Sequence, residues 1–273
     1  MGKGSVFVVK LKNSVIKVNR EIDFISFGRG SNVLIVIPGL GDGLGSVRGK
    51  KILYSFLYRK FSSKFKVYVI SRRNNLIKDF TTSEMADDII KTMDDLKISE
   101  AYFLGISQGG MILEMLALRH PKRIKKMVLA VTSSRPNAVL EKTINNWKDL
   151  ASRGKFVELS KDIFENSYTS SYMKKLRLIY PFLGMFVRKC DKERFLIQAD
   201  SCLKHNCFEK LEKIKIPTMV IGAENDKVLG VTSSYEISSK ISGSELVIYN
   251  GFGHGVYNES EAFKSKVVDF FLK

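Results

Sequence analysis

Residues 102–113 read Tyr-Phe-Leu-Gly-Ile-Ser-Gln-Gly-Gly-Met-Ile-Leu, and this stretch decides the fold of the chain. An apolar run ends in a turn where Gly105 and Gly109 flank Ser107, and an apolar helical pattern follows. This order is typical of a nucleophile elbow, a turn so tight that its flanking positions have no room for side chains. It predicts a strained serine whose hydroxyl projects from the carboxyl edge of a sheet, ready for acyl-transfer chemistry.

The residues on either side of this turn help to decide whether it is a nucleophile elbow, because a Gly-x-Ser-x-Gly pattern also arises by chance. Residues 100–104 form a short, largely apolar run that suits a strand covered on both faces. Apolar residues then recur at helical spacing over residues 108–118, and Pro121 forbids continuation of the helix. The alternative is a surface glycine turn with a capping serine, and the flanks favour the elbow.

Strand and helix patterns alternate on both sides of the turn. Strands are expected at residues 6–12, 15–18, 22–27, 32–37, 67–70, 101–104, 127–131, 218–221 and 245–249. Helices are expected at residues 50–60, 82–96, 108–118, 233–241 and 259–271. Strands spaced by helices predict an α/β fold with a mostly parallel sheet covered on both faces.

The alternation stops between residues 134 and 206, where the pattern is helical throughout. We therefore predict a core of residues 1–133 and 207–273, with a helical lid of residues 134–206 over the carboxyl edge of the sheet. Aromatic side chains of this insert either line an apolar pocket or pack the lid, and we favour packing for most of them. They are Trp147, Phe156, Phe164, Tyr168, Tyr172, Phe182 and Phe186.

A serine nucleophile needs a base, and the base needs an orienting carboxylate. Asp226 lies in the loop after the strand at 218–221, and His254 lies in a glycine-rich loop after the strand at 245–249. Because ligands of such sheets bind outside the carboxyl ends of the strands, these loops would deliver both side chains to Ser107. Glu224 is a second candidate for the acid, whereas His120 and His205 are less well placed as the base.

An oxyanion needs two N–H donors, each worth roughly 3 kcal/mol of the activation barrier. The backbone N–H of Gln108 follows the serine and supplies one. The loop after the strand at 32–37 reads Pro-Gly-Leu-Gly-Asp-Gly, and we expect the second donor to be the N–H of Leu40. The alternative for this loop is a plain connection between strand and helix.

Taken together, these segments resemble the α/β-hydrolases over about residues 31–131 and 206–272. The motifs that carry the resemblance are Pro38-Gly39-Leu40-Gly41, Gly105-Ile106-Ser107-Gln108-Gly109-Gly110, Gly222-Ala223-Glu224-Asn225-Asp226 and Gly251-Phe252-Gly253-His254. The resemblance implies an α/β-hydrolase fold with a mostly parallel eight-stranded sheet, helices on both faces and a helical lid inserted after the sixth strand. Residues 198–206 are similar to the serine carboxylesterase and 3-oxoadipate enol-lactonase-like branch.

The family pattern also implies a role for each candidate residue. Ser107 would be the nucleophile, His254 the base and Asp226, rather than Glu224, the orienting acid. Leu40 and Gln108 would be the two oxyanion donors. A serine at the nucleophile position, where haloalkane dehalogenases and epoxide hydrolases have aspartate, argues against those two activities.

The chain departs from the family pattern at two places. Pro38 stands where members often have histidine, which removes a supporting side chain but leaves the donor loop intact. Residues 71–75 read Ser-Arg-Arg-Asn-Asn where members often have Asp-x-Arg-Gly-x-Gly. Arg72 and Arg73 either bind an acidic substrate or have a structural or solvated role, and we favour the latter.

The composition bears on partners and location. The net charge of +17 comes from 45 lysines and arginines against 28 acidic residues. Nucleic acid, an anionic membrane surface or an acidic substrate could use such a charge, but no aromatic–basic interleaving appears, and we expect solvated charge without a nucleic-acid partner. No apolar run approaches the ~20 residues of a membrane span, and no signal peptide is visible, so we expect a cytoplasmic monomer or homodimer without stable membrane insertion.

The cysteines and histidines predict neither a disulfide nor a metal site. Three cysteines are an odd number, and Cys190, Cys202 and Cys207 suit reduced core or helix positions. The three histidines are scattered along the chain. We expect no metal and no cofactor.

The sequence thus predicts a serine hydrolase that cleaves a small to medium carboxylic ester or lactone. The same triad could instead hydrolyse a carbon–carbon bond, a thioester or a lipid, or transfer an acyl group. A non-catalytic binding protein with this fold is a further alternative, although it would not need serine, histidine and aspartate together. A basic protein that binds polyanions is the last alternative, and it predicts strongly salt-dependent binding.

Overall fold

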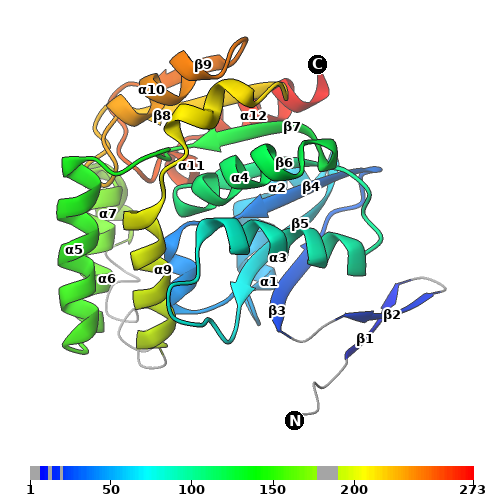
Figure 1. Cartoon of the computed structure of the whole chain (residues 1–273), viewed down its shortest axis with the longest axis horizontal. Coiled ribbons are helices and arrows are strands. Elements are labelled where there is room, and N and C mark those ends of the chain that lie inside the picture. Colours follow the sequence, from blue (N-terminus) through cyan, green and yellow to red (C-terminus); the bar gives the residue numbers. More distant parts are fainter. Residues whose placement is uncertain (1–6, 12–13, 19–20, 177–189) are drawn as a thin grey trace.

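The computed structural model describes residues 7–11, 14–18, 21–176 and 190–273 (Figure 1). Its centre is a seven-stranded sheet with the strand order β3-β5-β4-β6-β7-β8-β9. The strands are β3 (Ile22–Phe27), β4 (Asn32–Ile37), β5 (Phe65–Arg73), β6 (Ala101–Ile106), β7 (Ile124–Ala130), β8 (Thr218–Ala223) and β9 (Glu245–Tyr249). β3 pairs antiparallel with β5 and the other pairs are parallel, which confirms the mostly parallel sheet.

The expected count of eight strands is wrong for this sheet. The two N-terminal strands, β1 (Phe7–Leu11) and β2 (Ser14–Val18), pair with each other in a separate two-stranded sheet. A strand pattern indicates extended backbone but not the partner of the strand, because the pairing depends on distant contacts. The number of strands in the sheet therefore could not be read from the pattern alone.

Both faces of the sheet are covered, and alternate residues of each strand belong to different core layers. In β4, Ile35 and Ile37 pack with α3 (Thr82–Asp95), α4 (Gln108–Arg119) and α10 (Thr232–Lys240), whereas Leu34 and Val36 pack with α2 (Arg59–Ser62) and α12 (Glu261–Leu272). Both sides of the strand are fully buried. This explains why the strands read as continuous apolar runs.

The remaining short elements refine the predicted boundaries. The helix expected at residues 50–60 is divided at Tyr58 into α1 (Lys51–Leu57) and α2. The helix expected at residues 259–271 corresponds to α12, and a separate short helix, α11 (Val256–Glu259), precedes it. Three 3₁₀ turns join the elements, namely η1 (Leu40–Leu44), η2 (Pro121–Arg123) and η3 (Phe208–Lys213). β5 is longer than expected and runs to Arg73, so it includes Ser71 and Arg72.

Among the described residues, the chain between β7 and β8 contains helices joined by short loops and no strand. It contains α5 (Ala138–Ser152), α6 (Phe156–Ser167), α7 (Ser170–Leu176) and α9 (Lys192–Lys204). Figure 1 shows these helices beside the end of the sheet toward which the β7 arrow points. β7 is the fifth strand of the main sheet in chain order, not the sixth, because the first two strands form their own sheet.

A third apolar cluster joins these helices to the core. Trp147 and Leu159 pack there with Phe195, and Leu40 and Met111 of the core take part. Trp147 is buried in this cluster, so its side chain has a packing role, and its indole Nε1 donates to Oδ2 of Asp162 at 2.7 Å. Phe182 and Phe186 lie outside the described residues.

No described helix has both the length and the apolar character that crossing a membrane requires.

Candidate active site

Ser107 occupies the strained turn between β6 and α4. Its backbone has φ 53° and ψ −122°, a left-handed conformation that non-glycine residues rarely adopt. The flanking glycines make this possible, because a Cβ on Gly105 would lie 2.6 Å from the carbonyl oxygen of Gly109, and one on Gly109 would lie 2.0 Å from that of Ile37. The tight turn expected from the sequence is therefore present.

Two hydrogen bonds hold this turn to the neighbouring strand. The N–H of Ser107 donates to the carbonyl oxygen of Ala130 at 2.9 Å, and Oγ1 of Thr132 donates to the carbonyl oxygen of Ser107 at 2.8 Å. Thr132 also lies so close to Gly110 that a Cβ there would be 2.5 Å from it. Thr132 could not be predicted from the sequence, since nothing in its local pattern indicates this contact.

Asp226 and His254 form a buried pair at the same edge of the sheet. Nδ1 of His254 lies 2.8 Å from Oδ2 of Asp226, while the other carboxylate oxygen accepts the N–H groups of Val228 and Leu229 at 2.8 and 3.0 Å. Burial acts to raise the pKa of Asp226, but the facing His254 and the two N–H donors outweigh it, so the pKa lies below its ordinary value. The carboxylate is therefore held ionised beside the imidazole.

The competing acid, Glu224, is placed elsewhere. Its side chain is exposed, and Oε2 accepts the N–H of Gly251 at 2.9 Å. This contact supports the loop that carries His254 without touching the imidazole. The geometry favours Asp226 over Glu224 as the orienting acid.

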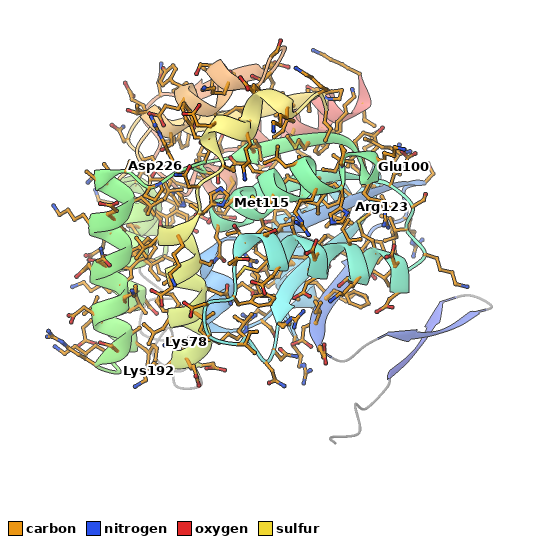
Figure 2. The ribbon with its side chains drawn as sticks, in the orientation of Figure 1. Lys78, Glu100, Met115, Arg123, Lys192 and Asp226 are labelled. Carbon is orange, nitrogen blue, oxygen red and sulfur yellow. The ribbon has the colours of Figure 1, made fainter. Side chains whose placement is uncertain are left out.

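Three loops converge at the carboxyl edge of the sheet, as the strand order requires. Ser107 follows β6, Asp226 follows β8 and His254 follows β9. Figure 2 shows Asp226 at this edge, while Glu100 and Arg123, which precede β6 and β7, lie at the opposite edge. Among the described residues, neither Oγ of Ser107 nor Nε2 of His254 has a hydrogen-bond partner, so both atoms remain available for chemistry.

The loop of His254 is also fixed by the helices that follow β7. The N–H of Gly255 donates to the carbonyl oxygen of Ser167 at 2.7 Å. A Cβ on Gly255 would lie 2.3 Å from the ring of Tyr168, and one on Gly253 would lie 2.8 Å from the same carbonyl oxygen. Glycine is required at both positions because the α6–α7 connection lies directly on the histidine loop.

The two predicted oxyanion donors flank Ser107. Leu40 begins η1, directly after Gly39, where a Cβ would lie 3.2 Å from Cβ of Ser107 and 3.7 Å from its Oγ. The glycine thus lets this loop approach the serine closely. Within the part of the chain that the structure describes, the backbone N–H groups of Leu40 and Gln108 have no acceptor, as an oxyanion hole requires.

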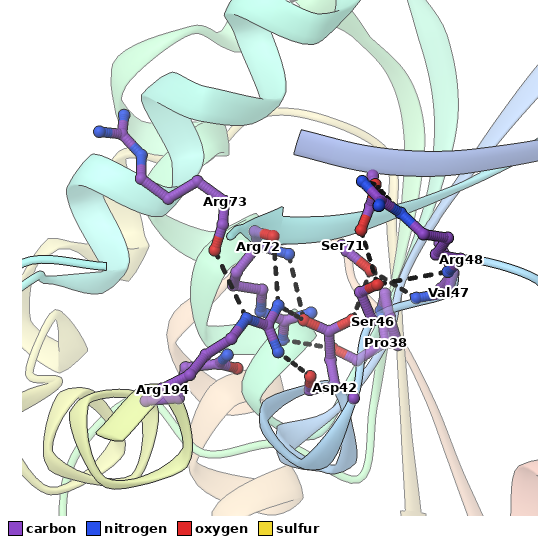
Figure 3. Close-up of polar contacts among 12 residues, drawn as sticks. Pro38, Asp42, Ser46, Val47, Arg48, Ser71, Arg72, Arg73 and Arg194 are labelled. Carbon is purple, nitrogen blue, oxygen red and sulfur yellow. Dashed lines mark hydrogen bonds and ion pairs between the residues drawn. The ribbon is translucent and has the colours of Figure 1, made fainter. Parts of the chain in front are cut away.

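A buried polar network lies behind these donors (Figure 3). The carboxylate of Asp42 accepts three hydrogen bonds. The donors are Oγ of Ser71 at 2.5 Å, the backbone N–H of Arg72 at 3.1 Å and Nη2 of Arg194 at 2.6 Å. Nη2 of Arg72 donates to Oε1 of Gln108 at 2.8 Å and to the carbonyl oxygen of Pro38. Arg72 therefore connects the two backbone segments that carry the donors.

Arg72 and Arg73 have different surroundings. The guanidinium of Arg72 is buried, and burial lowers its pKa to about 10 despite the opposing effect of Asp42. Arg73 instead pairs with Asp88, with Nε 2.7 Å from Oδ2, and its guanidinium lies over the ring of Phe80. Both arginines contact protein groups, which agrees with the structural role favoured from the sequence.

Comparison with known families identifies the class of protein. Residues 32–178, more than half of the chain, match the family described as alpha/beta hydrolase fold, and residues 199–273 match the family described as TAP-like protein. The chain therefore belongs to the α/β-hydrolase family, as its fold and the turn at Ser107 indicate.

Individual relatives are distant but match nearly whole chains. A protein of Caulobacter sp. (strain K31) named "Putative carbamate hydrolase RutD" is 26% identical over 244 residues, covering 85% of this chain and 88% of the relative. The 2-hydroxy-6-oxononadienedioate/2-hydroxy-6-oxononatrienedioate hydrolase of Escherichia coli (strain K12) is 20% identical, covering 93% and 91%. The enol-lactonase of Burkholderia xenovorans LB400 has a similar structure, with a TM-score of 0.80, 22% identity and coverage of 92% and 96%.

Proposed function

We propose that this protein is a serine hydrolase that cleaves a small to medium carboxylic ester or lactone. Ser107 is the nucleophile, His254 the general base and Asp226 the acid that orients it. The observation that carries the proposal is the 2.8 Å contact between His254 and Asp226 at the sheet edge where Ser107 is held in a strained turn. Packing alone does not explain why a serine, a histidine and an aspartate from three separate loops lie at this edge.

The first chemical step is attack on the acyl carbon. Asp226 accepts the Nδ1–H of His254, which leaves Nε2 unprotonated and able to take the proton of Ser107. As Oγ forms its bond to the carbonyl carbon, the negative charge on the carbonyl oxygen is stabilised by the N–H groups of Leu40 and Gln108. Protonated His254 then donates its proton to the leaving oxygen, and the acyl-enzyme forms.

The second step repeats this chemistry with water. His254 removes a proton from a water molecule, the hydroxide attacks the acyl carbon, and the ester bond to Ser107 breaks. Our proposed lid of residues 134–206 contacts the histidine loop through Ser167 and Tyr168. A lid in this position would also limit access of bulk water and select the acyl group.

A panel of p-nitrophenyl esters of increasing acyl length tests this proposal. We expect measurable release of p-nitrophenol from short acyl esters and decreasing kcat/KM as the chain lengthens. Relatives are named as a carbamate hydrolase, an enol-lactonase and a nonadienedioate hydrolase, so lactones and carbamates belong in the same panel. Absence of turnover on every ester, lactone and carbamate would favour the alternatives, namely another reaction of the triad or a non-catalytic binding role.

Substitution of Arg72 tests whether the buried network positions the oxyanion donors. Arg72→Lys keeps a positive charge, but its shorter side chain does not bring the ammonium to the position of Nη2, the nitrogen that donates to both the carbonyl oxygen of Pro38 and Oε1 of Gln108. We expect kcat to fall roughly 10- to 100-fold with a smaller change in KM, because displaced donors act mainly on the transition state. The matched control is Arg73→Lys, whose partner Asp88 lies outside this network, and both variants require melting temperatures. Equal kcat values for the two folded variants would show that Arg72 has only a structural role.

A further inference from the structure

A second cluster of reactive side chains lies away from Ser107. Glu114, on α4, faces His205 and Cys207, which follow α9, and all three are buried. Nε2 of His205 is 2.9 Å from Oε2 of Glu114, Sγ of Cys207 is 3.2 Å from the same oxygen, and Sγ and Nε2 are 3.5 Å apart. From the sequence we expected no metal site, because the three histidines are scattered along the chain and the cysteines suit reduced core or helix positions.

The spacing of these atoms matches one face of a zinc tetrahedron. With Zn–S near 2.3 Å and Zn–N or Zn–O near 2.0–2.1 Å, neighbouring ligand atoms lie about 3.3–3.6 Å apart. The three observed separations are within roughly 0.5 Å of those values. A carboxylate, an imidazole and a thiol are also the three side-chain types that zinc binds in proteins.

The burial of Glu114 and the missing hydrogen-bond partner of one of its oxygens provide an independent reason for a cation. Oε1 of Glu114 is buried and has no hydrogen-bond partner within the described part of the chain. Across those same residues, no lysine or arginine contacts this carboxylate, whose polar partners are His205 and Cys207. A buried carboxylate without a partner for one oxygen is unfavourable, and a divalent cation bound by both oxygens would remove that cost.

The surroundings of His205 also suit a metal ligand. Nδ1 of His205 lies 2.9 Å from Oγ1 of Thr82, a contact that can fix the ring and leave the lone pair of Nε2 directed at the cluster. A small surface cavity of about 40 Å³, lined by Thr82, Ser201 and His205 among others, reaches this imidazole. It is large enough for a water molecule and offers a route for an ion.

We propose that Glu114, His205 and Cys207 bind a zinc ion, with the imidazole Nε2, the thiolate and one or both carboxylate oxygens as ligands. Binding deprotonates the thiol of Cys207, and its proton passes to solvent. The proposed site links α4, which begins directly after Ser107, to the segment after α9. It does not depend on the proposed hydrolase function.

Metal analysis of the full chain tests this proposal without an activity assay. We expect about one zinc ion per chain after purification without chelators, measured by elemental analysis, in both the wild type and Ser107→Ala. Replacement of zinc by Co²⁺ should give a thiolate-to-cobalt charge-transfer absorption. Both signals should be lost in Cys207→Ser and retained in Cys202→Ser, which alters another buried thiol outside the cluster.

The result from the wild type is decisive even if Cys207→Ser does not fold. Folded wild-type protein that binds neither zinc nor Co²⁺ stoichiometrically would overturn the proposal. In that case Sγ–H and Nε2–H simply donate hydrogen bonds to Glu114. Zinc binding that survives in folded Cys207→Ser would also overturn it, because the ion would then lie elsewhere.

Discussion

Ser107→Ala is expected to lower kcat for the best p-nitrophenyl ester roughly 10⁴- to 10⁶-fold. Alanine removes the only atom that can form the acyl-enzyme, while the oxyanion donors and the buried pair of Asp226 and His254 remain. The left-handed backbone at position 107 is equally strained with serine or alanine, so the melting temperature should change little. Initial rates and thermal unfolding of the same preparations measure both effects.

The control for this prediction is Ser239→Ala, which removes an exposed hydroxyl on α10 that bonds only within its own helix. Its kcat should stay within about twofold of the wild type, as expected for a surface substitution. Hydrolysis by folded Ser107→Ala at a wild-type rate would show that another group attacks the ester, and the role of Ser107 would be wrong.

Asp226→Asn is expected to lower kcat by about 10⁴-fold. The side-chain carbonyl of asparagine can still accept the N–H groups of Val228 and Leu229, so the loop after β8 should keep its shape. Its amide, however, donates to Nδ1 of His254 and favours the tautomer with a proton on Nε2, which cannot accept the proton of Ser107. The pH dependence of kcat/KM and the melting temperature separate this effect from loss of structure.

Glu224→Gln is the matched control, since it changes the competing acid in the same loop. The amide oxygen of glutamine can still accept the N–H of Gly251, so we expect kcat within about twofold of the wild type. A large loss in Glu224→Gln together with a small loss in Asp226→Asn would reverse the assignment of the acid.

The lowered pKa of Asp226 also has a consequence for stability. Because the folded pKa lies below the unfolded value of about 3.9, the ionised carboxylate stabilises the native state above that pH. This contribution is lost as the pH falls through the folded pKa. Asp226→Asn lacks it, so the difference in unfolding free energy between wild type and variant should shrink below about pH 4.

The residues with local signatures could be predicted from the sequence. Glycines on both sides of Ser107 identify the elbow, because a side chain at either position would collide with the turn itself or with the adjoining end of β4. Apolar runs locate the strands of the sheet. Asp226 and His254 followed from the rule that the carboxyl ends of parallel strands share one edge. These inferences rest on patterns within a few residues or on a general property of the fold.

Features that depend on long-range packing could not be predicted. Arg72 lies 34 and 36 positions from Pro38 and Gln108 in the chain, and no pattern at Arg72 indicates that it bridges them. The contact between Glu114 and His205 spans 91 positions. The partners of the first two strands, and hence the number of strands in the main sheet, likewise depend on pairing that residue type does not specify.

Covalent labelling with a fluorophosphonate tests directly whether Ser107 is an activated nucleophile, since the reagent reacts preferentially with a serine that a neighbouring base has activated. We expect one adduct per chain, located at Ser107 by peptide mass spectrometry and absent from Ser107→Ala. Labelling should fall by orders of magnitude in His254→Gln, which removes the base. Folded wild-type protein that acquires no adduct, or acquires it at another residue, would show that Ser107 is not an activated nucleophile.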